Sequence, residues 1–162
     1  MTRFEFVSEK QYNETLNKLL CPYLGSTYDS LKLPCRATIG SAGYDFYAPF
    51  DFELEAGDSI LIPTGIRVKM ENGLFLMCAP RSGLGFKFRL QLDNTIGIID
   101  SDYYNSDNEG HIMAKLTNDT HDNKTVTVKQ GEAFMQGIFV QYFMTDDDFV
   151  TNKRNGGFGS TK

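Results

Sequence analysis

Two patterns of hydrophobic and polar positions divide the chain near residue 33. In residues 8–20, apolar side chains recur at helical spacing behind Ser8, a candidate helix N-cap. From there onward, short segments alternate apolar and polar residues between Gly, Pro, Asn or Asp, as in residues 66–70 before the Asn72-Gly73 turn. The pattern predicts one convincing helix followed by an all-β fold, either a barrel or a double-sheet sandwich.

The length of the chain limits its organisation. With 162 residues it can form one domain with a sizeable core. We expect an N-terminal helical extension over residues 1–32, a β domain over 33–150 and a C-terminal arm over 151–162. Residues 104–110 are polar and rich in turn formers, which predicts an exposed loop, and the Gly-rich arm is predicted to be flexible.

Composition and charge narrow the functional classes. No apolar run approaches the roughly 20 residues of a membrane span, and the N-terminus carries charges where a signal peptide has its apolar centre, so we expect a soluble cytoplasmic protein without a membrane partner. Three cysteines without CxxC spacing and two histidines disfavour a disulfide framework or a zinc site. A net charge of −5 disfavours nucleic acid as a partner, and an anionic ligand needs a local basic pocket or a metal ion.

The stretch NTIGIIDSDYY, residues 94–104, ends an apolar run with two carboxylates. If residues 98–102 are extended, Asp100 and Asp102 project from one face with Cα atoms roughly 6 to 7 Å apart, where they repel unless a cation or donor lies between them. The stretch alone is explained as simply by turn capping. A calcium loop does not fit its spacing, and a glycosidase stays a weak alternative because the chain has no Trp.

Four other segments combine turn residues with polar side chains. In APRSGLGFK, a turn constrained by Pro and Gly exposes Arg81 and Ser82 as a cradle for phosphate oxygens, although the segment is not a P-loop. Asp45 in SAGYDFYA requires a partner or solvent, and Gln136 in QGEAFMQGIFV requires a hydrogen-bond partner inside a strand. Phe158 in RNGGFGST suits a flap that orders on a ligand. Taken singly, each segment also has an ordinary structural explanation.

Taken in their order along the chain, five segments resemble the five successive motifs of the trimeric dUTPase family: SAGYDFYA, APRSGLGFK, NTIGIIDSDYY, QGEAFMQGIFV and RNGGFGST. The resemblance extends from about Leu33 to the C-terminus. It implies a jelly-roll-like β barrel and a homotrimer in which three active sites are shared between subunits. It also implies that water attacks the α-phosphorus of dUTP to release dUMP and pyrophosphate, which limits uracil in DNA and supplies dUMP.

The resemblance also implies a role for each matching residue. Asp100 is expected to be the general base, Asp102 to orient the site, and Asp45 to support it through Arg81 or a hydrated metal ion. Tyr103 is expected to lie against the deoxyribose and leave no space for a 2′-hydroxyl. The expected substrate contacts are Arg81, Ser82, Gly83 and Gln136 for the phosphates, Asn94, Gly97, Ile98 and Ile99 for uracil, Tyr103 and Met113 for the pocket, and Arg154, Phe158 and Gly159 from the arm. Mg²⁺ is expected as the cofactor, held by phosphates and waters without direct protein ligands.

The chain departs from the family pattern in three places. The loop after Tyr103 is enlarged, the arginine of the arm stands one residue closer to the aromatic than usual, with Lys153 beside Arg154, and the N-terminal helix has no counterpart. Two alternatives remain. One is a nucleotide-gated regulatory binding protein that contacts a protein regulator through the loop or the helix. The other is a dCTP deaminase-like enzyme on the same fold, which matches the tail and the hairpin less well.

Overall fold

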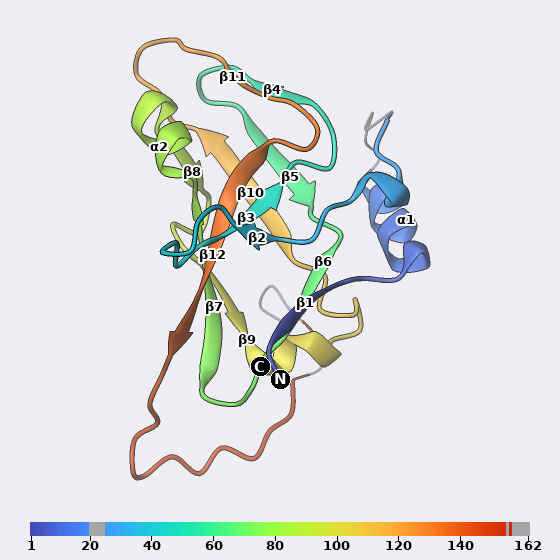
Figure 1. Cartoon of the computed structure of the whole chain (residues 1–162), viewed down its shortest axis with the longest axis vertical. Coiled ribbons are helices and arrows are strands. Elements are labelled where there is room, and N and C mark those ends of the chain that lie inside the picture. Colours follow the sequence, from blue (N-terminus) through green and yellow to red (C-terminus); the bar gives the residue numbers. More distant parts are fainter. Residues whose placement is uncertain (20–24, 155, 157–162) are drawn as a thin grey trace.

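The structure is a computed structural model that describes residues 1–19, 25–154 and 156. Strands dominate it, so the predicted all-β class with an N-terminal helix is confirmed (Figure 1). In chain order the elements are β1 (Arg3–Phe6), α1 (Glu9–Lys18), η1 (Tyr28–Ser30), β2 (Cys35–Arg36), β3 (Tyr44–Tyr47), β4 (Phe52–Leu54), β5 (Ser59–Pro63), β6 (Ile66–Lys69), β7 (Leu74–Pro80), α2 (Ser82–Phe88), β8 (Leu90–Leu92), β9 (Gly97–Asp100), η2 (Ser101–Asn105), β10 (Met113–Asn118), β11 (Val126–Val128) and β12 (Ala133–Gln141).

The largest sheet brings four of the five predicted motifs into neighbouring strands. Its order is β2-β3-β12-β7-β9, with β12 antiparallel to both β3 and β7. Gln136 is paired with Asp45 on one side and Ala79 on the other, and Cys78 is paired with Gly97. Segments far apart in the sequence therefore meet through backbone hydrogen bonds.

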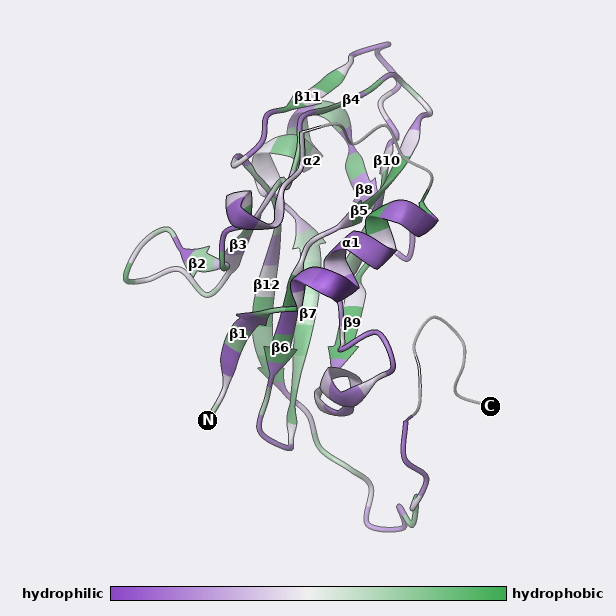
Figure 2. Ribbon diagram, turned by 90° about the vertical axis from the view of Figure 1, so that its right-hand side faces the viewer, coloured by the Kyte–Doolittle hydropathy of each residue, from purple (hydrophilic) through white to green (hydrophobic). Residues whose placement is uncertain are grey.

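Smaller sheets complete the jelly-roll-like barrel. Their orders are β5-β10-β8, β11-β4 and β1-β6. The alternating apolar side chains of these strands meet in one core, where Ile62, Leu76, Leu116 and Phe134 are fully buried. Figure 2 shows the hydrophobic stretches on the strands and a largely hydrophilic α1 on the outside. Among the described residues, no helix is long and apolar enough to cross a membrane.

The N-terminal helix forms where the sequence predicts it and packs against the barrel. The Ser8 hydroxyl oxygen accepts a hydrogen bond from the Gln11 N–H at 3.1 Å, so Ser8 is the N-cap. Tyr12 is fully buried and lies against the ring of His111, with centroids 6.0 Å apart. Because β1 pairs with β6 just before this helix, the N-terminal segment shares the barrel's hydrogen bonding.

The prediction that residues 8–20 form the only helix was wrong, because the structure has a second α-helix. The segment after Arg81, predicted as a constrained turn, forms the short helix α2. Leu84 and Phe88, four residues apart, pack against the core, and this burial outweighs the low helix propensity of the two glycines between Ser82 and Phe88. The helix ends at Arg89, whose φ of 51° is left-handed.

The stretch that carries the two carboxylates is only partly extended. Strand β9 ends at Asp100, and Asp102 lies in the 3-10 helix η2, so the condition that residues 98–102 are all extended is not met. Residues 104–110 also differ from the predicted exposed loop. Ser106 and Gly110 are buried, because this loop packs against the N-terminal segment.

His111, which follows the loop, is a buried histidine with partners on two elements. Its Nε2 accepts the Gly65 N–H at 2.9 Å, and its Nδ1 lies 3.3 Å from the Thr15 hydroxyl oxygen of α1. Burial lowers the pKa of His111 to about 4, although the nearby Glu109 carboxylate opposes that shift. The ring is therefore neutral in the folded protein at physiological pH.

This depressed pKa predicts a stability loss on acidification. The unfolded chain takes up the His111 proton near pH 6.5 and the folded chain only near 4, so folding stability falls by roughly 2 to 3 kcal/mol as the pH drops through that window. Urea unfolding of wild type and His111→Gln from pH 7 to pH 4.5, at one protein concentration, measures the difference. The variant, less stable at pH 7, should lose less stability, and parallel curves would contradict the prediction.

Candidate functional site

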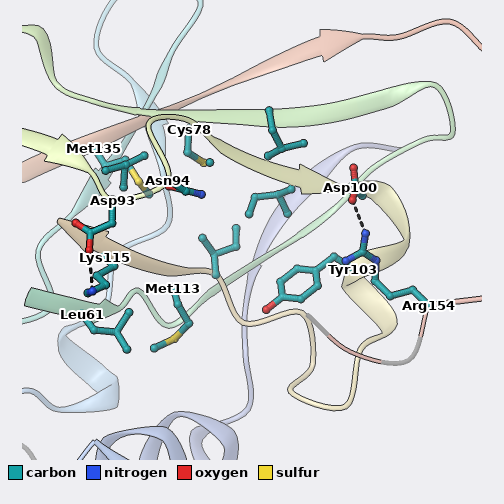
Figure 3. A pocket seen from close by; sticks show the side chains of 15 residues that line it. Leu61, Cys78, Asp93, Asn94, Asp100, Tyr103, Met113, Lys115, Met135 and Arg154 are labelled. Atoms are coloured by element: carbon teal, nitrogen blue, oxygen red, sulfur yellow. Dashed lines mark hydrogen bonds and ion pairs between the residues drawn. The ribbon is translucent and has the colours of Figure 1, made fainter. Parts of the chain in front are cut away.

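One cavity of about 400 Å³ opens between the β8–β9 hairpin, β10 and η2 (Figure 3). It is lined by Leu61, Cys78, Leu92, Asp93, Asn94, Gly97, Ile98, Ile99, Asp100, Tyr103, Ile112, Met113, Lys115, Met135 and Arg154. Its walls are mainly apolar, with charged groups at opposite ends (Figure 3). This composition is typical of a site for a small ligand with a flat apolar part and polar edges.

The predicted residues that line the cavity come from the third motif, the strand after it and the arm. They are Asn94, Gly97, Ile98, Ile99, Asp100, Tyr103, Met113 and Arg154. The third motif alone contributes six of these residues, because its hairpin and the start of η2 wrap around one side of the cavity. The motif thus acts as a single structural unit.

The hairpin between β8 and β9 is tight and presents backbone to the cavity. The Thr95 N–H donates to the Leu92 carbonyl oxygen at 2.8 Å, and Thr95 has a left-handed φ of 68°. A Cβ at Gly97 would lie 3.0 Å from the Cβ of Cys78, so glycine lets β9 approach β7 closely there. Exposed amide and carbonyl groups on such a hairpin can recognise a planar heterocycle by hydrogen bonds.

Arg154 joins the two carboxylates of the third motif at one end of the cavity. Its Nη2 donates to Asp100 Oδ2, and its Nε donates to Asp102 Oδ1 at 2.9 Å. The Arg154 side chain is 19% exposed, whereas the side chains of Asp100 and Asp102 are about half exposed. The Arg154 cation therefore offsets the repulsion between the two carboxylates, for which the sequence analysis had not identified a partner.

Tyr103 forms the wall beside this ion pair and is held by its hydroxyl. The side chain is only 6% exposed, and its hydroxyl donates to the His111 carbonyl oxygen at 3.0 Å. Burial raises the pKa of Tyr103, a shift that the hydrogen bond from Asn108 and the charge of Arg154 oppose. The phenol is thus a neutral, flat wall of the cavity.

A second charged pair, which the sequence reasoning did not find, lies at the other end of the cavity (Figure 3). The Lys115 Nζ lies 2.8 Å from Asp93 Oδ2, and the Thr117 hydroxyl donates to Asp93 Oδ1 at 2.5 Å. The alternation in β10, where Met113 and Lys115 flank a buried alanine, was the available signal that Lys115 faces the same side as Met113. The sequence pattern around the apolar lining residues did not indicate that they would face a cavity.

The remaining predicted contacts form a separate group that does not line the cavity. Arg81 Nε lies 3.4 Å from Asp45 Oδ1, and the Arg81 N–H donates to the Phe134 carbonyl oxygen at 3.1 Å. Gln136 is paired with Asp45, and Gly43 provides the space for its amide, because a Cβ there would collide with Gln136 Oε1. Ser82 and Gly83, at the start of α2, are exposed.

Two further sets of observations concern the arm and metal binding. Phe158 and Gly159 lie outside the described residues. Within the described part, no group of three or more His, Cys, Asp or Glu side chains could hold a metal ion.

Comparison with known proteins connects this geometry to one family. The family model described as dUTPase matches residues 29–162. The deoxyuridine 5′-triphosphate nucleotidohydrolase of Lactococcus lactis subsp. lactis (strain IL1403) is 40% identical over 134 residues, 81% of this chain and 88% of the relative. The crystal structure of dUTPase from Streptococcus mutans is 34% identical, with a TM-score of 0.66 over 89% of this chain and 98% of that chain.

A more distant structure shares the fold alone. It is a mutant dUTPase from phage phi11 of S. aureus, described with a structural Mg(II) ion, at 18% identity and a TM-score of 0.65 over 94% of this chain and 97% of that chain.

The ion pairs of Arg154 predict that this residue anchors the C-terminal segment. Arg154→Ala should release this segment and increase the rate of chymotrypsin cleavage at the exposed Phe149, whereas the exposed neighbour Lys153→Ala should cleave like wild type. Mass spectrometry of timed digests identifies the cut. Salt should increase wild-type cleavage by screening the ion pairs, and equal rates in both variants would show that Arg154 does not anchor the segment.

Proposed function

We propose that this chain, which belongs to the dUTPase family, hydrolyses dUTP to dUMP and pyrophosphate in the cavity of the third motif. The observation that carries this proposal is the joint lining of one cavity by a backbone-rich hairpin, the flat wall of Tyr103 and Asp100. Its physiological result is to limit uracil in DNA and to supply dUMP, and we place it in the cytoplasm with the nucleotide pool. The nucleotidohydrolase relatives support this activity over dCTP deamination.

Base and sugar selection follow from the shape of the cavity. Asn94 and the hairpin backbone at Gly97 and Ile98 hydrogen-bond the edge of uracil, and the narrow hairpin excludes the methyl group of thymine. Tyr103 lies against the deoxyribose and occupies the space that a 2′-hydroxyl needs. Met113 completes the apolar side of the pocket.

Asp100 is placed to act on the attacking water. It is the last residue of β9, so a regular strand holds its backbone, and its side chain is about half exposed. A carboxylate there orients a water toward the α-phosphorus and accepts its proton as the bond to phosphorus forms. Arg154 pairs with this carboxylate, and we infer that its guanidinium turns to the phosphates when the nucleotide binds.

The phosphate contacts require a second copy of the chain. The Asp45–Arg81 pair, Ser82, Gly83 and Gln136 lie apart from the cavity, and a homotrimer with shared sites would bring one subunit's group to its neighbour's cavity. Exposed apolar residues in the C-terminal segment support such an assembly. They are Phe143 and Met144, which are 87% and 72% exposed in the single chain.

Mg²⁺ is the expected cofactor, and the donor groups present suit it. Asp100 and Asp102 are half-exposed carboxylates at the end of the cavity where the reaction is proposed. Asp45 lies beside Arg81, one of the proposed phosphate contacts. Mg²⁺ commonly keeps several waters and binds through one or two carboxylates and substrate phosphates, so these residues would hold its hydrated form. When bound, the ion neutralises charge on the triphosphate and so offsets the acidity of the protein.

Removal of the base should stop turnover. We expect Asp100→Asn to lower kcat for dUTP by at least about a hundredfold, because the amide cannot accept the water proton. Pyrophosphate release in the presence of Mg²⁺ is the measurement. The neighbouring Asp102→Asn should lose less activity, exposed Asp107→Asn should behave as wild type, and unchanged thermal unfolding would show that the fold is intact. Wild-type turnover in Asp100→Asn would exclude this residue as the base.

A nucleotide panel tests base and sugar selection together. Wild type should prefer dUTP over dTTP, dCTP and UTP in kcat/KM, and Tyr103→Leu should lower the preference over UTP by about tenfold or more, because the flat wall is removed. Tyr142→Leu, outside the cavity, is the matched control. If Tyr103→Leu retains the wild-type ratio of dUTP to UTP, Tyr103 does not select the sugar.

A further inference from the structure

Two of the three parts of the chain that depart from the family pattern, the N-terminal segment and the enlarged loop, contact each other next to Tyr103. The Glu109 carboxylate of the enlarged loop accepts hydrogen bonds from the Ser8 N–H at 2.7 Å and the Ser8 hydroxyl at 2.6 Å. The Tyr104 hydroxyl donates to Glu5 of β1 at 2.7 Å. The N-terminal segment therefore braces residues 104–110 with charge-assisted hydrogen bonds.

Arg67 fixes the same loop from the barrel side. Its Nη2 donates to the Tyr104 carbonyl oxygen at 2.8 Å, and its guanidinium lies 3.7 Å from the centre of the Tyr104 ring. These contacts hold the residue directly after Tyr103 by both its backbone and its ring. The start of the loop thus has little freedom relative to β6.

The loop then returns tightly onto the backbone of Tyr103. Gly110 has a left-handed φ of 70°, and a Cβ there would lie 2.7 Å from Tyr104 Cα and 2.8 Å from the Tyr103 carbonyl oxygen. Only glycine fits this approach without a backbone shift. The enlarged loop is consequently packed against the tyrosine that precedes it.

Asn108 connects the braced loop to the side chain of Tyr103. Its Nδ2 donates to the Tyr103 hydroxyl oxygen at 2.8 Å, while its Oδ1 accepts the Gly110 N–H at 3.1 Å. Because the same hydroxyl donates to the His111 carbonyl oxygen at 3.0 Å, both hydrogen-bonding functions of the phenol are used. The direction of the ring is then fixed by two partners that flank the tight Gly110 turn.

We propose that Asn108 is a positioning residue for nucleotide selection, which sets the Tyr103 ring against the sugar through a loop braced by the N-terminal segment. The inference rests on the proposed role of Tyr103. It gives a purpose to the loop and the N-terminal segment: they hold the wall of the sugar pocket rigid, so that a 2′-hydroxyl cannot displace it. A wall held within about 0.5 Å discriminates better between two sugars that differ by one oxygen than a wall that is about 1 Å too loose.

The experiment measures kcat/KM for dUTP and UTP in Asn108→Ala, with exposed Asp107→Ala as the matched control. Loss of the hydrogen bond should lower the ratio of dUTP to UTP by about three- to tenfold, with kcat for dUTP changed less than twofold. A general destabilisation of the fold would lower kcat/KM for both nucleotides equally and leave their ratio unchanged. Asp107→Ala should keep the wild-type ratio.

A double-mutant cycle locates the effect at the Tyr103 hydroxyl. In a Tyr103→Phe background, Asn108→Ala should change the ratio no further, because its partner atom is absent. Asn108→Asp retains the acceptor for the Gly110 N–H but replaces the donor, so it should shift the ratio in the same direction even if Asn108→Ala folds poorly.

The outcomes separate this inference from the proposed function. A wild-type ratio in both Asn108 variants, or additive effects in the Tyr103→Phe background, overturns the positioning role while the sugar contact stands. If Tyr103→Leu also retains the wild-type ratio, both the sugar contact and the positioning role are wrong.

Discussion

The antiparallel pairing of β12 with both β3 and β7 is the constraint on which the rest of the structure depends. The register places Gln136 between Asp45 and Ala79, and through β7 it places Cys78 opposite Gly97. A slip of one residue would turn every side chain of β12 to the other face and bury Gln136 in place of Met135. The buried apolar face of the strand prevents that slip, so core packing and site geometry share one cause.

Charge is distributed so that an acidic protein can receive an anion. The chain has a net charge of −5, yet its cationic groups near the proposed site are each paired with a carboxylate: Arg154 with Asp100 and Asp102, and Lys115 with Asp93. Such pairs offset the repulsion between neighbouring carboxylates. Under the proposed function, a nucleotide would have to compete with these carboxylates for the cations.

The structure explains the role of the N-terminal segment, which its sequence does not indicate. Its strand pairs with β6, its helix covers His111, and its Ser8 binds the loop that follows Tyr103. Two of these contacts join distant parts of the chain and reach Glu109 and His111, the residues on either side of Gly110. An extension and an enlarged loop that look independent in the sequence are therefore one structural unit beside the proposed active site.

The sequence by itself determined the class of fold, the helix behind Ser8, the strands and the identity of the motifs, because alternation, caps and turn residues act over a few neighbouring positions. It misread the segment after Arg81 as a turn and did not show where β9 ends and η2 begins, since burial of Leu84 and Phe88 and the start of η2 depend on distant contacts. Only the tertiary structure showed that Arg154 bridges both acids and that Asn108 holds Tyr103. Hydrogen bonds and ion pairs between residues far apart in the chain leave no local periodicity, so no pattern in the sequence announces them.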